Sequence, residues 1–214
     1  MRGWPYVTFI LITINLAVFL FTYDWRTDTT SEYVIETFGL SPQIFPMNMY
    51  TLLTHMFIHA DFLHFSGNIL MLAILGLVTE PKIGSVKFLL FYLFSGFCAI
   101  PFAFLAQFFT HTPVVLIGAS GAIFGLMFLG AAIAGWEEVP AYLIPLLNIV
   151  AIPIMLLTLK NIKLPLFVAI LFYFLLNLIT MILNLPLSIG EVAHFGGIFG
   201  GMLAFWAILP EKLK

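Results

Sequence analysis

Long runs of hydrophobic residues alternate with short polar segments along most of the chain. A helix that crosses about 30 Å of hydrocarbon needs roughly 20 such residues. Six runs have about this length, and they predict transmembrane helices at 5–23, 62–79, 86–109, 118–135, 164–183 and 192–209. The pattern therefore predicts an all-α, polytopic integral membrane protein, with residues 1–214 forming a single domain of six helices.

Two other segments do not fit this simple alternation. Loop 24–61 has no strong period, but apolar residues recur between Met47 and Phe57, so its second half is expected to be an amphipathic, partly interfacial segment. The stretch 140–159 is apolar but contains three prolines, each of which removes a backbone donor where no water can replace it. We therefore expect 137–162 to lie in the interface or to extend the fourth helix, without crossing the membrane.

Composition supports the membrane assignment. The 214 residues are 62% hydrophobic and only 8% charged, which lies far outside the range of soluble globular domains. A net charge of −2 without any basic cluster gives no reason to expect a nucleic-acid partner. The single cysteine, Cys98, excludes a disulfide framework and a cysteine metal site. The lipid bilayer is therefore the expected environment.

The positions of the basic residues orient the predicted helices. Lysine and arginine concentrate in cytoplasmic loops of membrane proteins. If the N-terminus is inside, six crossings leave only Arg26 on the outer side. The other basic residues are then all cytoplasmic: Arg2, Lys82, Lys87, Lys160, Lys163, Lys212 and Lys214. We therefore expect a multi-pass protein of the cell membrane with both termini in the cytoplasm.

A serine between glycines opens the fourth run, in the sequence Gly118-Ala119-Ser120-Gly121. Such a serine is either a packing residue or a nucleophile. His194 opens the last run, and Gly197 and Gly201 follow it on the same side of the helix, as Gly121 and Gly125 follow Ser120. Stripes of small residues allow two helix backbones to approach closely, so Ser120 and His194 are predicted to come within about 3 Å of each other.

Further polar residues share the depth of this pair. His64 and Asn68 lie four residues apart on one face of the second helix, which runs in the same direction as the fourth and sixth helices. His64, Ser120 and His194 are therefore all expected near the outer face. A serine hydroxyl needs an adjacent base, and His194 can serve. Since Glu191 is expected in the loop, the prediction is a dyad, with the Ser120 backbone N–H, His64 and Asn68 as oxyanion donors.

Two other functions could use part of the same residues. His55, His59 and His64 have spacings that could suit zinc, but no glutamate follows His55 and no cysteine is near, so neither a metal nor another cofactor is predicted. A transporter or channel could use His64, Asn68 and His194 as a proton or ion path. Its polar residues would have to extend through the membrane, whereas only Glu80 lies toward the inner boundary.

Taken in order, these motifs resemble the rhomboid intramembrane serine proteases. The G-x-S-G motif is Gly118–Gly121, the H-x-x-x-N pair is His64 with Asn68, and the last-helix histidine is His194; the similarity extends from Thr54 to Gly201. The resemblance implies a six-helix bundle whose site lies in a water-filled cavity and cleaves transmembrane protein substrates. It also implies structural roles for His59 and Glu80, and an aromatic ring, Phe124, beneath the imidazole.

The sequence departs from that family in one motif. Many members carry Trp-Arg just before the histidine series, where this chain has Met49-Tyr50, and its only Trp-Arg is Trp25-Arg26 at the start of the loop. The first loop is therefore expected to be anchored differently. A catalytically silent relative that binds transmembrane helices is the competing interpretation, and the presence of both Ser120 and His194 argues against it. The fifth helix and residues 186–190 are the expected substrate gate.

Overall fold

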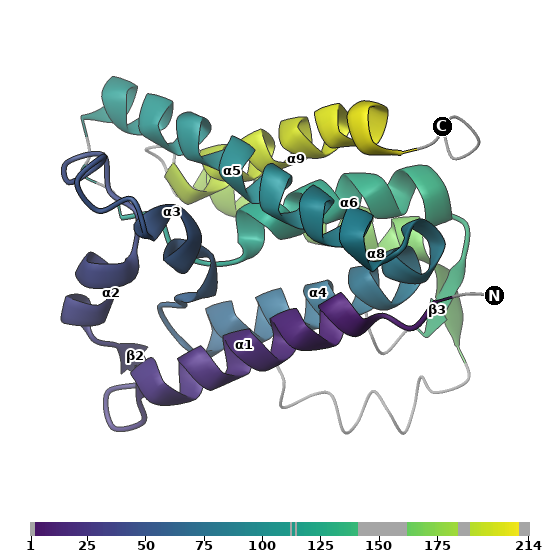
Figure 1. Ribbon diagram of the computed structural model, residues 1–214, viewed down its shortest axis with the longest axis horizontal. Coiled ribbons are helices and arrows are strands. Elements are labelled where there is room, and N and C mark those ends of the chain that lie inside the picture. Colours follow the sequence, from purple (N-terminus) through teal and green to yellow (C-terminus); the bar gives the residue numbers. More distant parts are fainter. Residues whose placement is uncertain (1–2, 112, 114, 141–161, 184–188, 210–214) are drawn as a thin grey trace.

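The computed structural model describes residues 3–111, 113, 115–140, 162–183 and 189–209. Most of them form helices: α1 (Tyr6–Thr22), α2 (Glu32–Phe38), α3 (Thr51–Thr54), the 3-10 helix η1 (His55–Phe57), α4 (Phe62–Ile83), α5 (Ser85–Thr110), α6 (Ser120–Ala134), α8 (Leu166–Leu183) and α9 (Ile189–Ile208). Two short antiparallel strand pairs join β1 (Tyr23–Asp24) to β2 (Thr29–Thr30) and β3 (Glu138–Pro140) to β4 (Lys163–Pro165). The chain is thus an all-α bundle with two small strand pairs (Figure 1).

Each of the six predicted runs is helical. By length and composition, α4, α5 and residues Gly190–Ile208 of α9 can cross a membrane, whereas the apolar segments Tyr6–Thr22, Ser120–Ala134 and Leu166–Leu175 are shorter. These apolar helices make the chain a multi-pass membrane protein. Six crossings remain a prediction.

Three helix boundaries differ from those expected. The fourth predicted helix begins at Ser120 because Gly118 has a φ of +100°, outside the helical region. The second continues past its predicted end at residue 79 and stops where Gly84 adopts a φ of +85° and its N–H donates to the Glu80 carbonyl. The sixth begins at Ile189, three residues before the predicted start. Glu191 therefore lies in a helix and not in the loop.

The long first loop is structured. Ser31 caps α2, and the Thr30 hydroxyl donates a hydrogen bond of 2.6 Å to the His59 carbonyl, which ties the two ends of the loop together. In its second half, Thr51 and Met56 are buried while Met49 is exposed, so one side faces the bundle. Caps and contacts with the bundle therefore order a segment whose sequence has no strong period. Its interfacial position remains a prediction.

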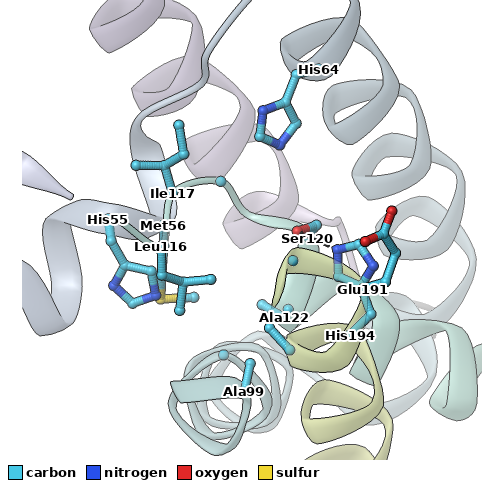
Figure 2. A pocket seen from close by; sticks show the side chains of 15 residues that line it. His55, Met56, His64, Ala99, Leu116, Ile117, Ser120, Ala122, Glu191 and His194 are labelled. Carbon is cyan, nitrogen blue, oxygen red and sulfur yellow. Dashed lines mark hydrogen bonds between the residues drawn. The ribbon is translucent and has the colours of Figure 1, made fainter. Parts of the chain in front are cut away.

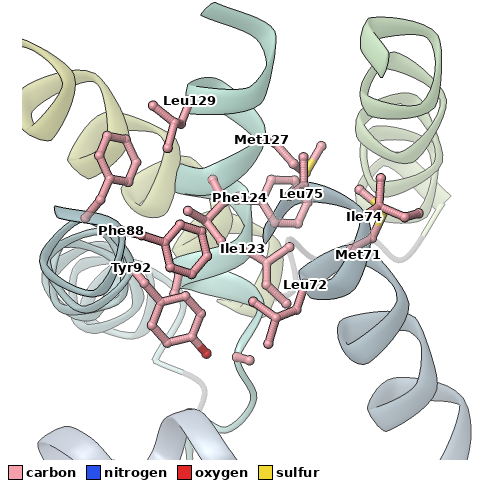
Figure 3. Packing of buried hydrophobic residues seen from close by; sticks show 14 of the residues in the cluster. Met71, Leu72, Ile74, Leu75, Phe88, Tyr92, Ile123, Phe124, Met127 and Leu129 are labelled. Atoms are coloured by element: carbon pink, nitrogen blue, oxygen red, sulfur yellow. The ribbon is translucent and has the colours of Figure 1, made fainter. Parts of the chain in front are cut away.

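The hydrophobic core lies between α4, α5 and α6. It is built mainly from large side chains that are fully buried, among them Leu72, Leu75, Phe88, Tyr92, Ile123 and Phe124 (Figure 3). The outward surfaces of the same bundle are also apolar: Phe21 and Phe109, for example, are 90% and 71% exposed. A helix bundle that is apolar both inside and outside is suited to lipid and not to water.

The last helix, α9, packs along both α5 and α6. Two glycine pairs make this possible. Gly197 and Gly201 lie against the backbone of α6, and Gly196 and Gly200 lie against α5 at Cys98. The first pair follows from the small-residue spacing that the sequence shows, and the second shows that α9 uses small residues on two sides.

Elements at the two ends of the bundle are well separated. Figure 1 shows α2 and α3 at one end, with the start of α1, the end of α9 and strand β3 at the other. At the latter end, Lys82 forms an ion pair with Glu137, and β3 pairs with β4 so that Pro140 lies opposite Lys163. The expectation for 137–162 falls largely on residues 141–161, which are outside the described residues. Of the expected gate, the fifth helix is described as α8, whereas residues 184–188 are outside the described residues, and the gating role remains a prediction.

Glu80 connects α4 to the beginning of α1. Its carboxylate is buried and accepts hydrogen bonds from the backbone N–H groups of Val7 at 2.9 Å and Thr8 at 2.7 Å. The hydroxyls of Thr8 and Ser85 also donate to it, at 2.7 and 2.6 Å. The carboxylate therefore satisfies N–H groups in the first turn of α1 that have no partner within that helix.

Candidate active site

Ser120 and His194 meet where α6 and α9 begin. The hydroxyl oxygen of Ser120 lies 2.8 Å from Nε2 of His194, a hydrogen-bonding distance (Figure 2). Phe124, one turn after Ser120, stacks on the imidazole with 4.1 Å between ring centroids and 7° between ring planes. The hydroxyl thus holds one edge of the histidine ring, and the phenyl ring covers one of its faces.

Direct backbone contact between the two helices brings this pair together. A Cβ atom on Gly197 would overlap the carbonyl oxygen of Gly121, and one on Gly201 would lie 2.7 Å from the carbonyl oxygen of Gly125. Gly125, on the α6 side of the crossing, is equally confined, because a Cβ there would meet the side chain of Ser95 and the Gly197 carbonyl oxygen. No larger residue fits at this crossing without moving a backbone.

The segment before Ser120 is fixed by the first loop. The Gly118 N–H donates to the His55 carbonyl at 2.8 Å, and Leu116 exchanges backbone hydrogen bonds of 2.8 and 2.9 Å with Leu40. Gly118 also passes close to His64, since a Cβ on it would lie 2.6 Å from His64 Nε2. The first loop and the start of α4 together determine where α6 begins.

His64 presents a donor to this segment. The Ala60 N–H donates to His64 Nδ1 at 3.4 Å, which assigns the ring proton to Nε2, the atom beside Gly118. Asn68 is buried, and its side-chain N–H₂ donates one hydrogen bond of 3.1 Å to the His64 carbonyl. Its second N–H is the one left for another acceptor. Asn68 lies behind Gly118 and is not among the residues that line the adjoining cavity.

A cavity of about 160 Å³ adjoins the pair. Its polar lining comprises His55, His64, Ser120, Glu191 and His194, and its remaining walls are glycines and apolar residues from η1, α5, the segment 116–118, α6 and α9 (Figure 2). Sequence reasoning missed Glu191 as a cavity residue because it placed the start of the last helix at 192. The spacing of three residues between Glu191 and His194, once on a helix, puts the two side chains on one face.

The other histidines of the series support the site from the side. His55 Nδ1 bonds the Thr51 carbonyl at 2.8 Å, and burial lowers the pKa of His55 to about 4, so it is neutral at pH 7. His59 packs edge-on against His64 with ring centroids 5.1 Å apart, and burial, followed by the charge of His64, lowers its pKa to about 3. Over the described residues, no three acidic, histidine or cysteine side chains are grouped to hold a metal ion.

The fold and the site together define a polytopic membrane protein in which a hydroxyl and an imidazole are paired beside an internal cavity. Comparison with known proteins gives the family: residues 46–211 match the family model of the Rhomboid domain, and the chain belongs to the rhomboid family. This confirms the resemblance drawn from the ordered motifs. Rhomboid proteins are generally intramembrane serine proteases.

Two similar proteins come from Arabidopsis thaliana. RHOMBOID-like protein 7 is 29% identical over 163 residues, which cover 75% of this chain and 43% of that protein. Rhomboid-like protein 11, chloroplastic, is 30% identical over 131 residues, which cover 60% of this chain and 43% of that protein. The chain thus covers less than half the length of either relative.

Proposed function

We propose that the protein is an intramembrane serine endopeptidase that hydrolyses peptide bonds in or near transmembrane segments of membrane proteins. Ser120 acts as the nucleophile, and His194 acts as general base and then as general acid. The observation that carries the proposal is the 2.8 Å contact between Ser120 Oγ and His194 Nε2 beside the cavity. Membership of the rhomboid family supports the same reaction.

The pair is suited to acyl transfer in two stages. His194 Nε2 takes the proton of Ser120 as the hydroxyl oxygen attacks the substrate carbonyl, and then gives that proton to the leaving nitrogen. The resulting ester on Ser120 is hydrolysed by a water molecule that His194 deprotonates, which releases the new carboxyl end and restores the serine. Phe124 keeps the imidazole in the plane that both proton transfers require.

The oxyanion donors proposed are the Ser120 backbone N–H and the side chains of His64 and Asn68. The first N–H groups of a helix have no partner within that helix, so the N–H of Ser120 at the start of α6 is available. His64 offers Nε2–H, and Asn68 offers its second N–H. Removal of one such donor costs roughly 3 kcal/mol of transition-state stabilisation.

The remaining predicted site residues have supporting roles in this proposal. Gly121, Gly125, Gly197 and Gly201 hold α6 against α9, and Gly118 lets the chain pass His64. His59 packs behind His64, and Glu80 anchors α1 to α4 at the far end of the bundle.

The proposed orientation places the site toward the outer face of the cell membrane, with both chain termini in the cytoplasm. Lys82 and Lys163 lie at the end of the bundle that holds β3 and β4, whereas His64 and Ser120 open helices at the opposite end. This arrangement agrees with an excess of positive charge on the cytoplasmic side. Lipid would surround the apolar exterior, and the substrate would be a neighbouring transmembrane helix.

Labelling and cleavage in proteoliposomes test this function. A fluorophosphonate should label Ser120, and Ser120→Ala and His194→Ala should each abolish cleavage of a single-span substrate. Ser66→Ala and His111→Ala are the matched controls, because they remove the same groups away from the cavity, and both should cleave normally. Cleavage that survives Ser120→Ala would rule out the proposal. A protein that binds the substrate helix without labelling or cleavage would be the silent relative.

A further inference from the structure

A second pocket lies at the C-terminal end of α5. It has a volume of about 430 Å³, and its walls come from the last two turns of α5, from the turn that follows Leu40 in the first loop and from Pro113. Figure 1 shows the end of α5 and the first loop at the same end of the bundle. The residues that line this pocket are all different from those that line the cavity beside Ser120. The proposed reaction therefore does not account for it.

Rings form much of this pocket. Phe104 and Phe108 lie one turn apart on one face of α5, and Pro42 and Pro113 contribute two further rings. Phe104 is held by an edge-on contact with Phe45, with 6.0 Å between ring centroids, whereas Phe108 is 70% exposed. The pocket is thus fixed at Phe104 and open at Phe108.

Gln43 gives the pocket an oriented amide donor. The hydroxyl of Ser41, a buried residue, donates to Gln43 Oε1 and accepts the Gln43 backbone N–H at 3.4 Å. These contacts use the amide oxygen, and over the described residues the side-chain N–H₂ of Gln43 donates no hydrogen bond. A donor held beside apolar rings suits the carbonyl of a bound peptide.

Aromatic rings with a nearby donor are typical of sites that bind extended, proline-containing segments. A segment in the polyproline II conformation has no internal hydrogen bonds, so its carbonyls can accept, and its prolines pack on aromatic rings. Contact with lipid explains exposed phenyl rings by itself, and Phe109, which is 71% exposed and does not line the pocket, is an example. Contact with lipid does not explain the two prolines or the oriented amide of Gln43.

The pocket is also joined to the cavity beside Ser120. Leu116 lines that cavity and exchanges backbone hydrogen bonds of 2.8 and 2.9 Å with Leu40. Pro42 follows Leu40 by two residues, and Pro113 precedes Leu116 on the other chain segment by three. Seven residues lead from Pro113 to Ser120, so this edge of the pocket is at most about 25 Å from the nucleophile. A polyproline II segment, which rises about 3.1 Å per residue, covers that distance with about eight residues.

From these observations we infer that the pocket is an exosite, which binds an extended, proline-containing segment of the substrate outside the membrane. The inference rests on the proposed protease function and deepens it by naming a substrate class. The prolines of the segment would pack on Phe104 and Phe108, and the Gln43 N–H₂ would donate to one of its carbonyls. This contact lies away from the reacting atoms, so it strengthens substrate and transition state equally and lowers KM without changing kcat.

Cleavage of a matched substrate set tests the inference. Single-span substrates carry Pro-Pro or Ala-Ala at each position up to about eight residues outside the cleaved bond, and kcat and KM are measured in proteoliposomes. At the best position, KM should be about tenfold lower for Pro-Pro at equal kcat, the factor expected for burying roughly 55 Å² of apolar surface. Phe108→Ala should bring the KM ratio close to one, and Phe108→Tyr should retain it. Gln43→Glu, which replaces the donor by an acceptor, should reduce the ratio.

Phe109→Ala is the matched control, because Phe109 is as exposed as Phe108 and touches its ring edge-on without lining the pocket. It should keep the wild-type ratio. Equal KM values for Pro-Pro and Ala-Ala at every position, or a preference that survives Phe108→Ala, overturns the inference while cleavage itself stands. An equal loss of the preference in Phe109→Ala also overturns it, since the pocket would then not be the cause.

A binding measurement separates this inference from the proposed function. Ser120→Ala protein in proteoliposomes should bind a soluble Pro-Pro peptide, taken from the best substrate, about tenfold more tightly than its Ala-Ala counterpart. Ser120→Ala combined with Phe108→Ala should bind the two peptides equally. If the wild-type protein cleaves nothing, the proposed function fails, and the peptides then decide about the pocket: a preference that depends on Phe108 retains it as a peptide-binding site, and equal binding removes it.

Discussion

The contact between Gly197 and α6 makes a single methyl group a strong test of the site. In Gly197→Ala, the new Cβ would overlap the carbonyl oxygen of Gly121 and would lie 2.9 Å from its carbonyl carbon and 3.2 Å from its Cα. All three atoms belong to backbone, so no side chain can rotate out of the way. The two helices have to separate.

The size of this movement follows from the contact distances. Carbon–oxygen contacts between neighbouring backbones settle at about 3.3–3.6 Å, so α9 has to move away from α6 by about 1.5 Å. Added to the present 2.8 Å, this places Ser120 Oγ about 4.3 Å from His194 Nε2, beyond hydrogen-bonding reach. A displacement of this size costs about 100-fold in rate, and overpacking costs about 1–3 kcal/mol in stability.

Proteoliposome cleavage and thermal unfolding in detergent measure the two effects. Gly67→Ala is the control: Gly67 is a helical glycine of α4, and a Cβ there would lie 3.9 Å from the Tyr173 hydroxyl, an ordinary contact. It should cleave within about twofold of wild type and unfold no earlier, since alanine favours a helix over glycine. A Gly197→Ala protein that cleaves and is labelled at wild-type rates would refute the reasoning.

Three further changes probe other contacts. Glu80→Gln should lower the free energy of unfolding by about 2–3 kcal/mol, measured in mixed micelles, because a neutral amide is a weaker acceptor for the buried donors of Thr8. Gly39→Ala should lower cleavage about tenfold while the protein remains folded, since its Cβ would overlap Val115 and displace the segment before Ser120. Burial lowers the pKa of His55 in the folded protein to about 4, compared with 6.5 for an exposed histidine. As the pH falls from 6.5 toward 4, His55 therefore becomes protonated in the unfolded chain but not in the folded protein. Stability should be complete above pH 6.5 and fall by up to about 1.4 kcal/mol per unit below it, and His55→Gln should reduce this slope in unfolding titrations.

Much of the bundle could be predicted because membrane helices leave a simple signal. Each needs a long apolar run, so the six helical regions were located from hydrophobicity. The depth expected for His64 rests on counting crossings and remains a prediction. The glycine spacing around Ser120 and His194 predicted that their helices would touch, and the structure brings the two side chains to 2.8 Å. The roles assigned to them remain proposals.

What the sequence did not reveal depended on local backbone geometry. The start of α6 is set by the positive φ of Gly118, and a hydrophobicity pattern contains no information about a backbone dihedral angle. The order in the first loop comes from individual hydrogen bonds, such as that between Leu40 and Leu116, which join residues far apart in sequence. The polar character of Glu191 suggested a loop, although helix first turns favour acidic residues, and this error hid its place in the cavity.

The direction of α9 is the condition on which the whole site depends. Ser120 and His194 can meet only if their helices begin at the same end of the bundle, which requires that the chain between them runs back along the bundle once, or another odd number of times. The described parts of the chain meet this condition: β3 follows α6, pairs with β4, and β4 leads directly into α8, so α8 starts where α6 ends. α8 then returns toward the end where Ser120 lies, and α9 begins there with Glu191 and His194 in its first two turns. The pairing of the two three-residue strands thus places the end of α6 beside the start of α8. If α8 started instead at the end of the bundle where Ser120 lies, α9 would begin at the opposite end, and His194 would be far from Ser120.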